Sequence, residues 1–369
     1  MALYEFWLHG LQDLPTKIKN KLYHYFPNIE ELYKAKEKRL KSLGFLEEAH
    51  MAIIRKGQRE ENFKKAYEEL EKKLIRFIPW NAKDYPECLL EMPDYPHGLF
   101  VKGKLPDPKK FSVGIVGARK CTTYGEHYAL EYGKRLSEAG IQIISGMAKG
   151  IDGTSHRGCL TGGTATFAVL GSGVDVCYPR ENIGLYQDIL RKDGGIISEY
   201  MPGTPPLAFH FPMRNRIISG FSNALIVIEA KEKSGSLITA DLALEQGKEV
   251  YALPGSVNSS YSVGCHMLIK QGAGILISPE EFLKDLEDFN KNFIKLNKSG
   301  FKGSDGSNYK KVLDSFHNMV YSRMCLVPKN IDELIRETDL AVDVVMEILV
   351  SLELEGLIKE VAKNYYVRL

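Results

Sequence analysis

The chain has 369 residues, of which 44% are hydrophobic and 26% are charged, and its formal net charge is +2. These values are ordinary for globular proteins and exclude fibrous, collagen-like and largely disordered chains. At about 150 residues per domain, the length predicts two or three domains, each able to bury a core. The small net charge neither requires nor excludes nucleic acid, so any basic site must be local.

The cysteines and the apolar runs indicate the cellular compartment. Six cysteines are present and no two form a CxxC pair, which argues against a zinc site and a disulfide framework and favours a reducing cytoplasm. The longest apolar runs, such as 224–228, are far shorter than the roughly 20 residues that span a bilayer. The first ten residues, MALYEFWLHG, lack a basic region and an apolar core, so we expect no secretory signal. We expect a cytoplasmic protein with no membrane partner and no metal.

The first domain is predicted over residues 1–72. This segment is rich in Lys, Glu and Leu and poor in Gly, and apolar residues such as Ile29, Leu32 and Tyr33 recur at helical spacing. The pattern predicts a small helical bundle of the SAM-like or helix-hairpin-helix kind.

Residues 73–286 have a different sequence pattern from the first domain, because short runs rich in Ile and Val alternate with helical stretches. This alternation predicts an α/β fold with a Rossmann-like, doubly wound and mostly parallel sheet. The runs are apolar throughout, as expected of strands that are covered on both faces. The predicted strands are 112–116, 141–145, 165–170, 195–198, 224–228, 249–253 and 274–277.

A polar stretch over 287–308, rich in Asn, Lys, Gly and Ser, is predicted to be a linker. Residues 309–369 then combine a helix, a capping box at Asn330 and Glu333, a further helix from about residue 341 to 353 and a hairpin. Three helices followed by a hairpin are typical of a winged-helix domain.

The charge of the predicted winged helix does not suit a DNA groove. Residues 309–369 hold 8 basic and 10 acidic side chains, and no Lys or Arg lies between Ala341 and Glu355. Asp343 and Glu347 on the predicted recognition helix would repel phosphates. We therefore expect this domain to contact protein or to act as a spacer.

Glycine-rich loops follow several of the predicted strands. Ligands of open parallel sheets bind beyond the carboxyl ends of the strands, where glycines let the backbone approach an anion and helix-start N–H groups bind it. A single loop of this kind is more often a tight packing turn, but four loops with cations nearby favour a phosphate or phosphodiester site. The residues predicted to form it are Gly117, Arg119, Gly146, Lys149, Gly171, Gly173, Arg180, Lys231, Lys233, Ser234, Gly235 and Ser236.

None of these loops reads GxGxxG in the dinucleotide register, and no GxxxxGK[ST] is present. Binding of NAD and hydrolysis of nucleoside triphosphates by a P-loop are therefore disfavoured. We expect no cofactor.

A second cluster lies within 209–220, where Phe211 precedes Arg214, Asn215 and Arg216. Guanidinium groups pair with phosphates and aromatic rings stack on bases. The combination suits a single nucleic-acid strand better than a small phosphate. The alternative is a surface helix start that contains buried ion pairs.

Asp152 and His156 are four residues apart at a predicted helix start and can share a face. Such a pair can be catalytic, but it more often caps a helix and fills a polar niche. No Ser or Cys nucleophile is tied to His156 by the local sequence, so we assign no catalytic residue. Cys265 and His266 are expected to be packed rather than reactive.

Taken in order, these runs resemble the DNA-processing protein A family (DprA, also called Smf). The resemblance covers the whole central block, whereas the flanking domains match more weakly. The runs that carry it include 85–90 (YPECLL), 117–119 (GAR), 145–152 (SGMAKGID), 171–173 (GSG), 211–218 (FPMRNRII) and 234–240 (SGSLITA).

The resemblance implies a single-stranded DNA-binding protein of natural transformation that shields incoming strands and helps to load the RecA recombinase. It also implies a homodimer formed through the Rossmann-like domain, a DNA pocket at the sheet edge and no catalytic activity. Position 208 is Ala where some relatives carry lysine, a departure that the resemblance implies weakens one phosphate contact. The cations that match the family's DNA contacts are Arg119, Arg214, Arg216 and Lys231. Arg180 stands where many relatives have lysine, which keeps the charge but changes its geometry.

Two alternatives stay open at this point. The central block also resembles, more distantly, the cytokinin-activating phosphoribohydrolases, which use a Pro-Gly-Gly-x-Gly-Thr loop with an acidic residue nearby. The equivalent stretch is 234–241, where Asp241 supplies an acid but the glycine pattern is broken. This alternative predicts an enzyme that hydrolyses a nucleotide phosphate. The other alternative is a scaffold in which the basic loops only stabilise a dimer.

Overall fold

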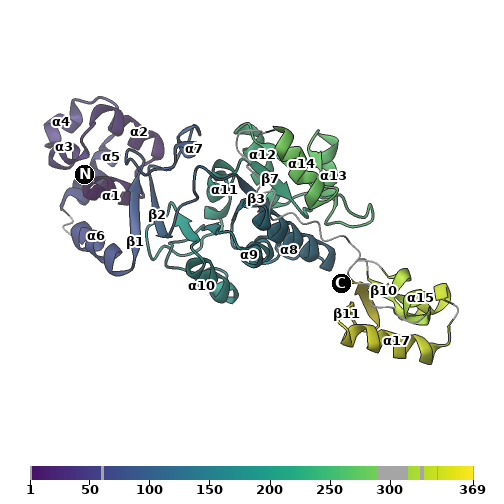
Figure 1. Ribbon diagram of the computed structural model, residues 1–369. Helices are drawn as coiled ribbons and strands as arrows, with labels where there is room; N and C mark the ends of the chain where they lie inside the picture. The colour runs from purple at the N-terminus through teal and green to yellow at the C-terminus, as the bar shows by residue number, and fades with distance from the viewer. Residues whose placement is uncertain (1, 60–61, 290–314, 325–327, 339, 369) are drawn as a thin grey trace.

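The computed structural model describes residues 2–59, 62–289, 315–324, 328–338 and 340–368. Across these ranges no helix combines the length and the apolar character needed to cross a bilayer. Within the same ranges, no group of three or more His, Cys, Asp and Glu is placed to hold a metal ion. Figure 1 shows the N-terminal helices beside one edge of a large central sheet.

The N-terminal segment is a helical bundle, as its apolar spacing predicts. Its core contains the fully buried side chains of Leu22, Leu32, Leu40 and Ile54, with Trp7 beside them. Amphipathic faces of this kind are buried against one another because none of these short helices is stable alone. The helices are α1 (Ala2–Gly10), α2 (Thr16–Tyr25), α3 (Ile29–Lys34), α4 (Glu37–Lys41), α5 (Glu48–Arg59) and α6 (Asn62–Lys72).

The central block folds around a nine-stranded sheet with the order β1-β2-β6-β5-β4-β3-β7-β8-β9. Strands β3 to β9 run parallel to one another, and β2 is antiparallel to both of its neighbours. The fold is therefore α/β and Rossmann-like, which confirms the predicted class. The strands are β1 (Ile75–Pro79), β2 (Gly98–Gly103), β3 (Ser112–Val116), β4 (Gln142–Ser145), β5 (Thr166–Val169), β6 (Gly195–Ser198), β7 (Ala224–Val227), β8 (Glu249–Ala252) and β9 (Gly274–Ile275).

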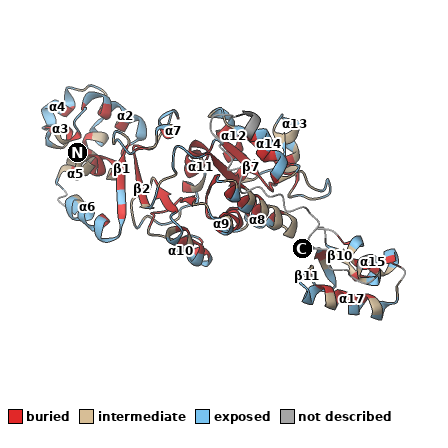
Figure 2. Ribbon diagram, in the orientation of Figure 1, coloured by how far each residue is buried: buried red, intermediate tan, exposed pale blue. Residues whose placement is uncertain are grey.

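Helices cover both faces of this sheet, and the strands between them are buried (Figure 2). One face packs against α8, α9 and α14 through a cluster that includes Tyr132, Ile151 and Phe282. The other face packs against α7, α11, α12 and α13 through a cluster that includes Ile217 and Leu268. The helices of this block are α7 (Glu87–Leu90), α8 (Thr123–Glu138), α9 (Ile151–Gly162), α10 (Ile183–Arg191), α11 (His210–Phe221), α12 (Gly235–Glu245), α13 (Val263–Lys270) and α14 (Pro279–Phe289).

The seven predicted strands correspond to β3 to β9. The apolar runs did not reveal β1 and β2, which form an antiparallel pair at the sheet edge. Strand β3 lies between β4 and β7. The strands that follow β3 are added first on the β4 side and later, from β7 onward, on the other side. In open α/β sheets, this switch point opens a crevice at the carboxyl ends of the strands.

The C-terminal segment folds as a three-helix domain with a small sheet in the order β10-β12-β11. The predicted capping box is confirmed, because the Glu333 carboxylate accepts the Asn330 N–H at 3.2 Å and the Asn330 side chain accepts the Asp332 N–H at 2.9 Å. The predicted linker overlaps α14 up to residue 289 and otherwise lies outside the described residues. The elements are α15 (Ser315–Arg323), β10 (Lys329–Asn330), α16 (Ile331–Thr338), α17 (Val342–Leu354), β11 (Ile358–Ala362) and β12 (Tyr365–Arg368).

Three buried histidines predict an acid-sensitive fold. Burial lowers the pKa of His9 and of His156 to about 3, and that of His97 to about 4. In the unfolded chain each imidazole takes up a proton below about pH 6.5, so the unfolded state binds more protons than the fold. The free energy of unfolding should therefore fall between about pH 6.5 and pH 4, by up to about 1.4 kcal/mol per pH unit for each histidine.

Urea unfolding followed by circular dichroism at several pH values checks this prediction. Each histidine replaced singly by a neutral residue should reduce the slope of stability against pH. A free energy of unfolding that stays constant from neutral pH down to about pH 5 would contradict the buried, neutral state.

Candidate nucleic-acid interface

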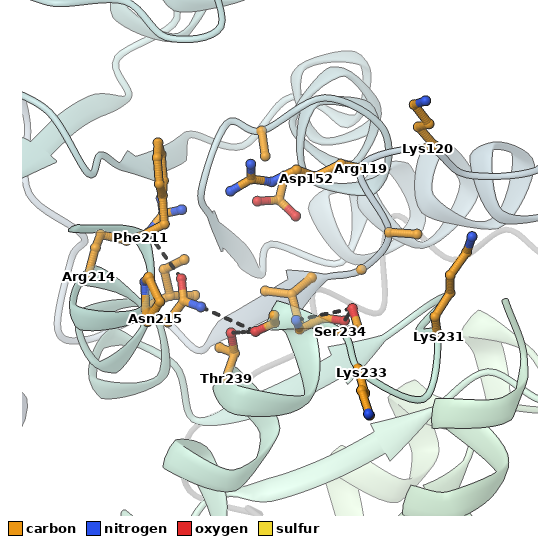
Figure 3. Close-up of a pocket in the computed structure, with 18 of the residues that line it drawn as sticks. Arg119, Lys120, Asp152, Phe211, Arg214, Asn215, Lys231, Lys233, Ser234 and Thr239 are labelled. Atoms are coloured by element: carbon orange, nitrogen blue, oxygen red, sulfur yellow. Dashed lines mark hydrogen bonds between the residues drawn. The ribbon is translucent and has the colours of Figure 1, made fainter. Parts of the chain in front are cut away.

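A cavity of about 420 Å³ opens at the predicted strand-end edge, beside the switch point (Figure 3). Five cationic side chains and one carboxylate line it, so it carries a strong local positive charge in a nearly neutral chain. Ten of the predicted site residues are in its lining. They are Gly117, Arg119, Phe211, Arg214, Asn215, Lys231, Lys233, Ser234, Gly235 and Ser236.

Three of the glycine-rich loops form the walls of this cavity. The loop after β3 contributes Arg119, the segment after β4 contributes Asp152, and the loop after β7 contributes Lys231 and Lys233. Arg119 and both lysines are exposed. Figure 3 shows Arg119 beside Asp152, with Lys231 on the opposite side of the cavity from Arg214. Exposed cations around a concave surface attract a polyanion at little cost in desolvation.

Arg214 reaches the cavity from α11 but is itself buried, with only 4% of its surface exposed. It donates hydrogen bonds to the carbonyl of Gly146 at 3.0 Å and to the carbonyl of Val169. Burial lowers its pKa to about 10, an effect that the carboxylate of Asp152 partly offsets. Burial raises the pKa of Asp152, and Arg214 opposes that change in turn. Arg214 therefore stays protonated at neutral pH and has a fixed orientation in the cavity wall.

Two aromatic rings in the cavity each carry a cation over their face. The guanidinium carbon of Arg119 is 4.9 Å from the ring centroid of Phe211, and the ammonium of Lys231 is 4.4 Å from that of Tyr261. The ring of Tyr178 lies 5.6 Å from that of Phe211. Cation–aromatic contacts hold long side chains in place while the charge stays available to an anion. The arrangement places stacking surfaces next to phosphate-binding groups.

Helices α8 and α12 both begin near the cavity, and they differ in their access to anions. At the start of α8, the carboxylate of Glu229 accepts the backbone N–H of Thr122 at 2.9 Å and its hydroxyl at 2.6 Å. A protein carboxylate thus occupies the place where dinucleotide-binding folds hold a pyrophosphate. The first turn of α12 has no acidic residue, and its Ser234, Gly235 and Ser236 line the cavity. A phosphate would therefore be stabilised at α12 rather than at α8.

Six predicted site residues are not in the cavity lining: Gly146, Lys149, Gly171, Gly173, Arg180 and Arg216. Arg216 is buried and forms ion pairs with Asp94 at 2.9 Å and Glu199 at 2.8 Å. The buried ion pair considered as an alternative for this cluster therefore applies to Arg216 and not to Arg214. Lys149 is exposed and pairs with Glu181 at 2.6 Å, and Arg180 is exposed.

The three glycines outside the cavity act through close packing. A Cβ at Gly146 would lie 2.5 Å from both terminal nitrogens of Arg214, and a Cβ at Gly171 would lie 3.0 Å from the ring of Phe211. A Cβ at Gly173 would meet the carbonyl of Met201 at 2.7 Å. Gly146 and Gly171 thus make room for the side chains that line the cavity, although they do not line it themselves.

The structure adds cavity residues that the sequence analysis did not assign. Lys120 directly follows Arg119, which was the available signal for it. Tyr261 comes from the loop after β8, which contains a single glycine, Gly255, and no charged residue. Asp152 was noted with His156, but only Asp152 lines the cavity. His156 is buried, with Nδ1 2.6 Å from the Thr166 hydroxyl, so the two do not form a joint site.

The fold and the cavity together define a Rossmann-like protein with a cationic, aromatic cavity at its strand ends. The family model described as DNA recombination-mediator protein A matches residues 76–287, and that of the DprA winged helix domain matches residues 310–362. The chain belongs to the DNA recombination-mediator protein A family, known as DprA or Smf. The resemblance noted from the sequence motifs and the winged-helix prediction are both confirmed.

Individual relatives agree with this assignment. Protein Smf of Escherichia coli is 44% identical over 218 residues, which cover 59% of this chain and 58% of that protein. The DNA processing protein DprA of Streptococcus pneumoniae is 44% identical over 220 residues, 59% of this chain and 77% of that protein. The chain thus spans little more than half the length of the E. coli relative.

Solved structures show the same fold. The DNA processing protein A of S. pneumoniae matches with a TM-score of 0.67 and 34% identity, covering 77% of this chain and 98% of that one. DNA processing protein A of Helicobacter pylori, described as having a unique single-stranded DNA binding mode, matches with a TM-score of 0.52 and 27% identity. That match covers 58% of this chain and 96% of the H. pylori chain.

Proposed function

We propose that this protein binds single-stranded DNA in the strand-end cavity, catalyses no reaction on it, and helps to load the RecA recombinase during natural transformation. The observation that carries the proposal is the pairing of cations with aromatic rings, Arg119 with Phe211 and Lys231 with Tyr261. Binding of a single strand without sequence preference needs phosphate neutralisation and base stacking rather than contacts to base edges. Family membership supports the role in recombination, and the cytoplasm as the place of action is part of the same proposal.

The aromatic side chains suggest a path for the strand beyond the cavity. Tyr178, which contacts Phe211, is 42% exposed, and Phe209 is 64% exposed. The exposed cations Arg180 and Lys149 come from the neighbouring loops after β5 and β4. We propose that bases stack outward from Phe211 onto Tyr178, and that Arg180 neutralises a phosphate further along the strand.

Fluorescence anisotropy with labelled oligo-dT at two salt concentrations, with duplex DNA as competitor, tests the proposal. We expect tight binding that weakens strongly with salt and that duplex competes poorly, because paired bases cannot stack on the protein. Absence of binding at low salt would refute the proposed site. The part of the proposal that concerns RecA needs its own assay, the rate of RecA filament assembly on strands coated with a single-strand-binding protein.

Ala208 offers a gain-of-function test of the same site. It is exposed and lines the cavity, at the position where some relatives carry lysine. Ala208→Lys is expected to raise the affinity for oligo-dT several-fold and to steepen the logarithmic salt slope by about 0.7, the value for one additional phosphate contact on a single strand. Ala208→Gln, of similar length but uncharged, is the matched control and should leave the slope unchanged. Equal slopes for the two variants would contradict the placement of the strand.

We also propose that the protein forms a homodimer through the Rossmann-like domain, at the β9 edge of the sheet. Ile275 and Ile277 are 51% and 75% exposed there, and Met267 on the adjacent α13 is also exposed. A short, apolar sheet edge of this kind favours association with a second copy. Light scattering should give the dimer mass for the intact chain and the monomer mass for Ile275→Glu, and a wild-type monomer would refute the proposal.

The winged helix is proposed to contact protein rather than DNA. On α17, Val342, Met346, Val350 and Leu354 are all exposed and form a ridge at intervals of four residues. An apolar ridge on the helix that would enter a major groove is suited to a protein surface and not to phosphates. Competition with duplex DNA also tests this point. If the winged helix does not bind DNA, a chain that lacks residues 309–369 should bind duplex as strongly as the intact chain does.

The competing nucleotide-hydrolase function finds less support in the site. Asp241, its acidic candidate, is exposed on α12 and is not in the cavity lining. The carboxylate that does line the cavity is Asp152. Burial raises its pKa, and the positive charges of Arg214 and Arg119 oppose that rise. Incubation with nucleoside monophosphates separates the two functions, because a hydrolase releases free base whereas a DNA-binding protein leaves the nucleotide intact.

A further inference from the structure

Helix α11 presents two different faces to its surroundings. Phe211, Arg214, Asn215 and Ile218 line the cavity, at intervals of three and four residues that place them on one side of the helix. Arg216 follows Asn215 by about 100° and Arg214 by about 200° around the helix axis. Its side chain therefore points away from the cavity, toward Asp94 and Glu199.

The ion pairs of Arg216 are well formed. Its Nη2 donates to both carboxylate oxygens of Glu199, at 2.9 and 2.8 Å, and its Nε donates to Asp94 at 2.9 Å. Burial alone would lower the pKa of Arg216, but the two carboxylates outweigh burial and raise it. Such charge-assisted pairs fix both direction and distance, because the guanidinium group is planar and its donors form a rigid fork.

Glu199 in turn connects this face of α11 to the N-terminal helices. Its backbone carbonyl lies 2.7 Å from Nε2 of His9 on α1. Lys19 on α2, which is 8% exposed, donates to the carbonyl of His9 at 3.1 Å. Burial lowers the pKa of Lys19 to about 8, and the negative charge of Glu199 acts against that change. Glu199 thus lies between a cation of α11 and a cation of the N-terminal bundle.

Aromatic packing surrounds this polar junction. The ring of Tyr23 on α2 lies 5.6 Å from that of Trp80 and 4.9 Å from that of His97, both of which belong to the central block. The Glu5 carboxylate on α1 accepts a hydrogen bond from Asn81 at 3.0 Å. The N-terminal bundle is therefore packed against the segment that follows β1 and the loop that precedes β2.

We propose that Arg216 and Glu199 are positioning residues, which anchor α11 to the N-terminal bundle and thereby hold Phe211 and Arg214 in the DNA cavity. The inference rests on the proposed binding of single-stranded DNA. It assigns the N-terminal bundle a role in shaping the cavity, although the described N-terminal residues do not line it. It also gives the two neighbouring arginines different tasks, since Arg214 faces the strand and Arg216 holds the helix.

A phosphate-binding role and a positioning role of Arg216 predict opposite effects of Glu199→Gln on the affinity for DNA. If Arg216 bound a phosphate directly, Glu199→Gln would remove a competing negative charge, and affinity would stay the same or rise. If Arg216 positions α11, Glu199→Gln releases the helix, and affinity should fall about three- to ten-fold. The logarithmic salt slope also differs, because loss of a phosphate contact lowers it by about 0.7 whereas loss of positioning leaves it unchanged.

Anisotropy titrations of oligo-dT with the full chain test the inference. We expect Arg216→Gln and Glu199→Gln to weaken binding by similar factors without altering the salt slope. The double variant should be no worse than either single one, because both act on the same anchor. Arg216→Lys, which keeps the charge, should recover part of the affinity.

Controls separate positioning from general loss of stability. Lys104→Gln removes one member of an exposed ion pair with Asp193 far from α11, and should leave affinity unchanged. Val250→Ala trims a buried side chain in β8, and should lower the melting temperature but not the affinity for folded protein. If Glu199→Gln does not fold, Asp94→Asn replaces it, because Asp94 is half-exposed and holds the same guanidinium.

Each outcome bears on one of the two claims. Failure of the wild-type chain to bind oligo-dT would refute the proposed function, and the positioning role would fall with it. Wild-type binding together with an unchanged or increased affinity of Glu199→Gln would overturn the positioning role alone. So would a reduced salt slope in Arg216→Gln, because it would mean that Arg216 contacts a phosphate.

Discussion

Replacing Arg119 by alanine is expected to lower the affinity for single-stranded DNA roughly ten-fold, and by a similar factor for every base composition. Arg119 is exposed, lines the cavity and lies over the ring of Phe211. Its loss removes a charge-assisted phosphate contact of about 1.5–3 kcal/mol, together with the cation that orders the stacking ring. Anisotropy titrations of oligo-dT, oligo-dA and mixed sequences over a range of salt concentrations measure the effect.

The salt slope distinguishes a phosphate contact from other causes. Arg119→Ala should reduce the logarithmic slope by about 0.7. Arg191→Ala is a matched control, because Arg191 is also an exposed arginine and pairs with Asp188 on α10, outside the cavity. A change in base preference without a general loss of affinity would show that Arg119 contacts bases, contrary to the proposed site.

Gly146→Ala is expected to weaken binding as strongly as Arg214→Ala, although it removes no charge. The added Cβ would lie 2.5 Å from both terminal nitrogens of Arg214, so the guanidinium group must leave the place where it faces Asp152. Arg214 would also lose its hydrogen bond to the Gly146 carbonyl. Overpacking of a buried site typically costs about 1–3 kcal/mol, so the free energy of unfolding should fall along with the affinity.

Gly184→Ala provides the control for the effect of the extra methyl group. No atom lies within 4 Å of a Cβ added at Gly184 in α10, so this variant should bind DNA like the wild type and be slightly more stable. Denaturant unfolding measures stability and anisotropy measures affinity in the same preparations. Wild-type affinity of Gly146→Ala would mean that the buried guanidinium group contributes little to the interface.

The two arginines of the Arg-Asn-Arg run show how far sequence can assign a role. Both fit a phosphate-binding pattern, and the sequence offered a buried ion pair only as a general alternative. In the structure the two side chains have different surroundings, because residues two apart on a helix point to nearly opposite sides. Arg214 faces the cavity, and Arg216 meets Asp94 and Glu199, which come from distant parts of the chain. Which arginine has which neighbour therefore depends on how α11 lies in the fold.

The edge strands show a similar limit in the fold. Strands β3 to β8 are predictable because parallel strands covered on both faces have continuous apolar runs. The edge strand β9 was predicted from its apolar run 274–277, although Ile275 is exposed. β1 and β2 pair antiparallel at the edge, and Arg76 within β1 is exposed, so β1 lacks such a run. Their pairing depends on the long connection between them and on the N-terminal helices that pack against them.

The sequence by itself determined the fold class, the winged helix and ten residues of the cavity, because these follow from local periodicity and from motifs at strand ends. Only the tertiary structure decided which glycines border the cavity and which make room for its side chains. It also brought together Asp152, in the first turn of α9, and Tyr261, in the loop after β8, which are about 110 residues apart in the chain. The physical reason is that a parallel sheet gathers the ends of distant strands at one edge, and no local pattern records which side chains meet there.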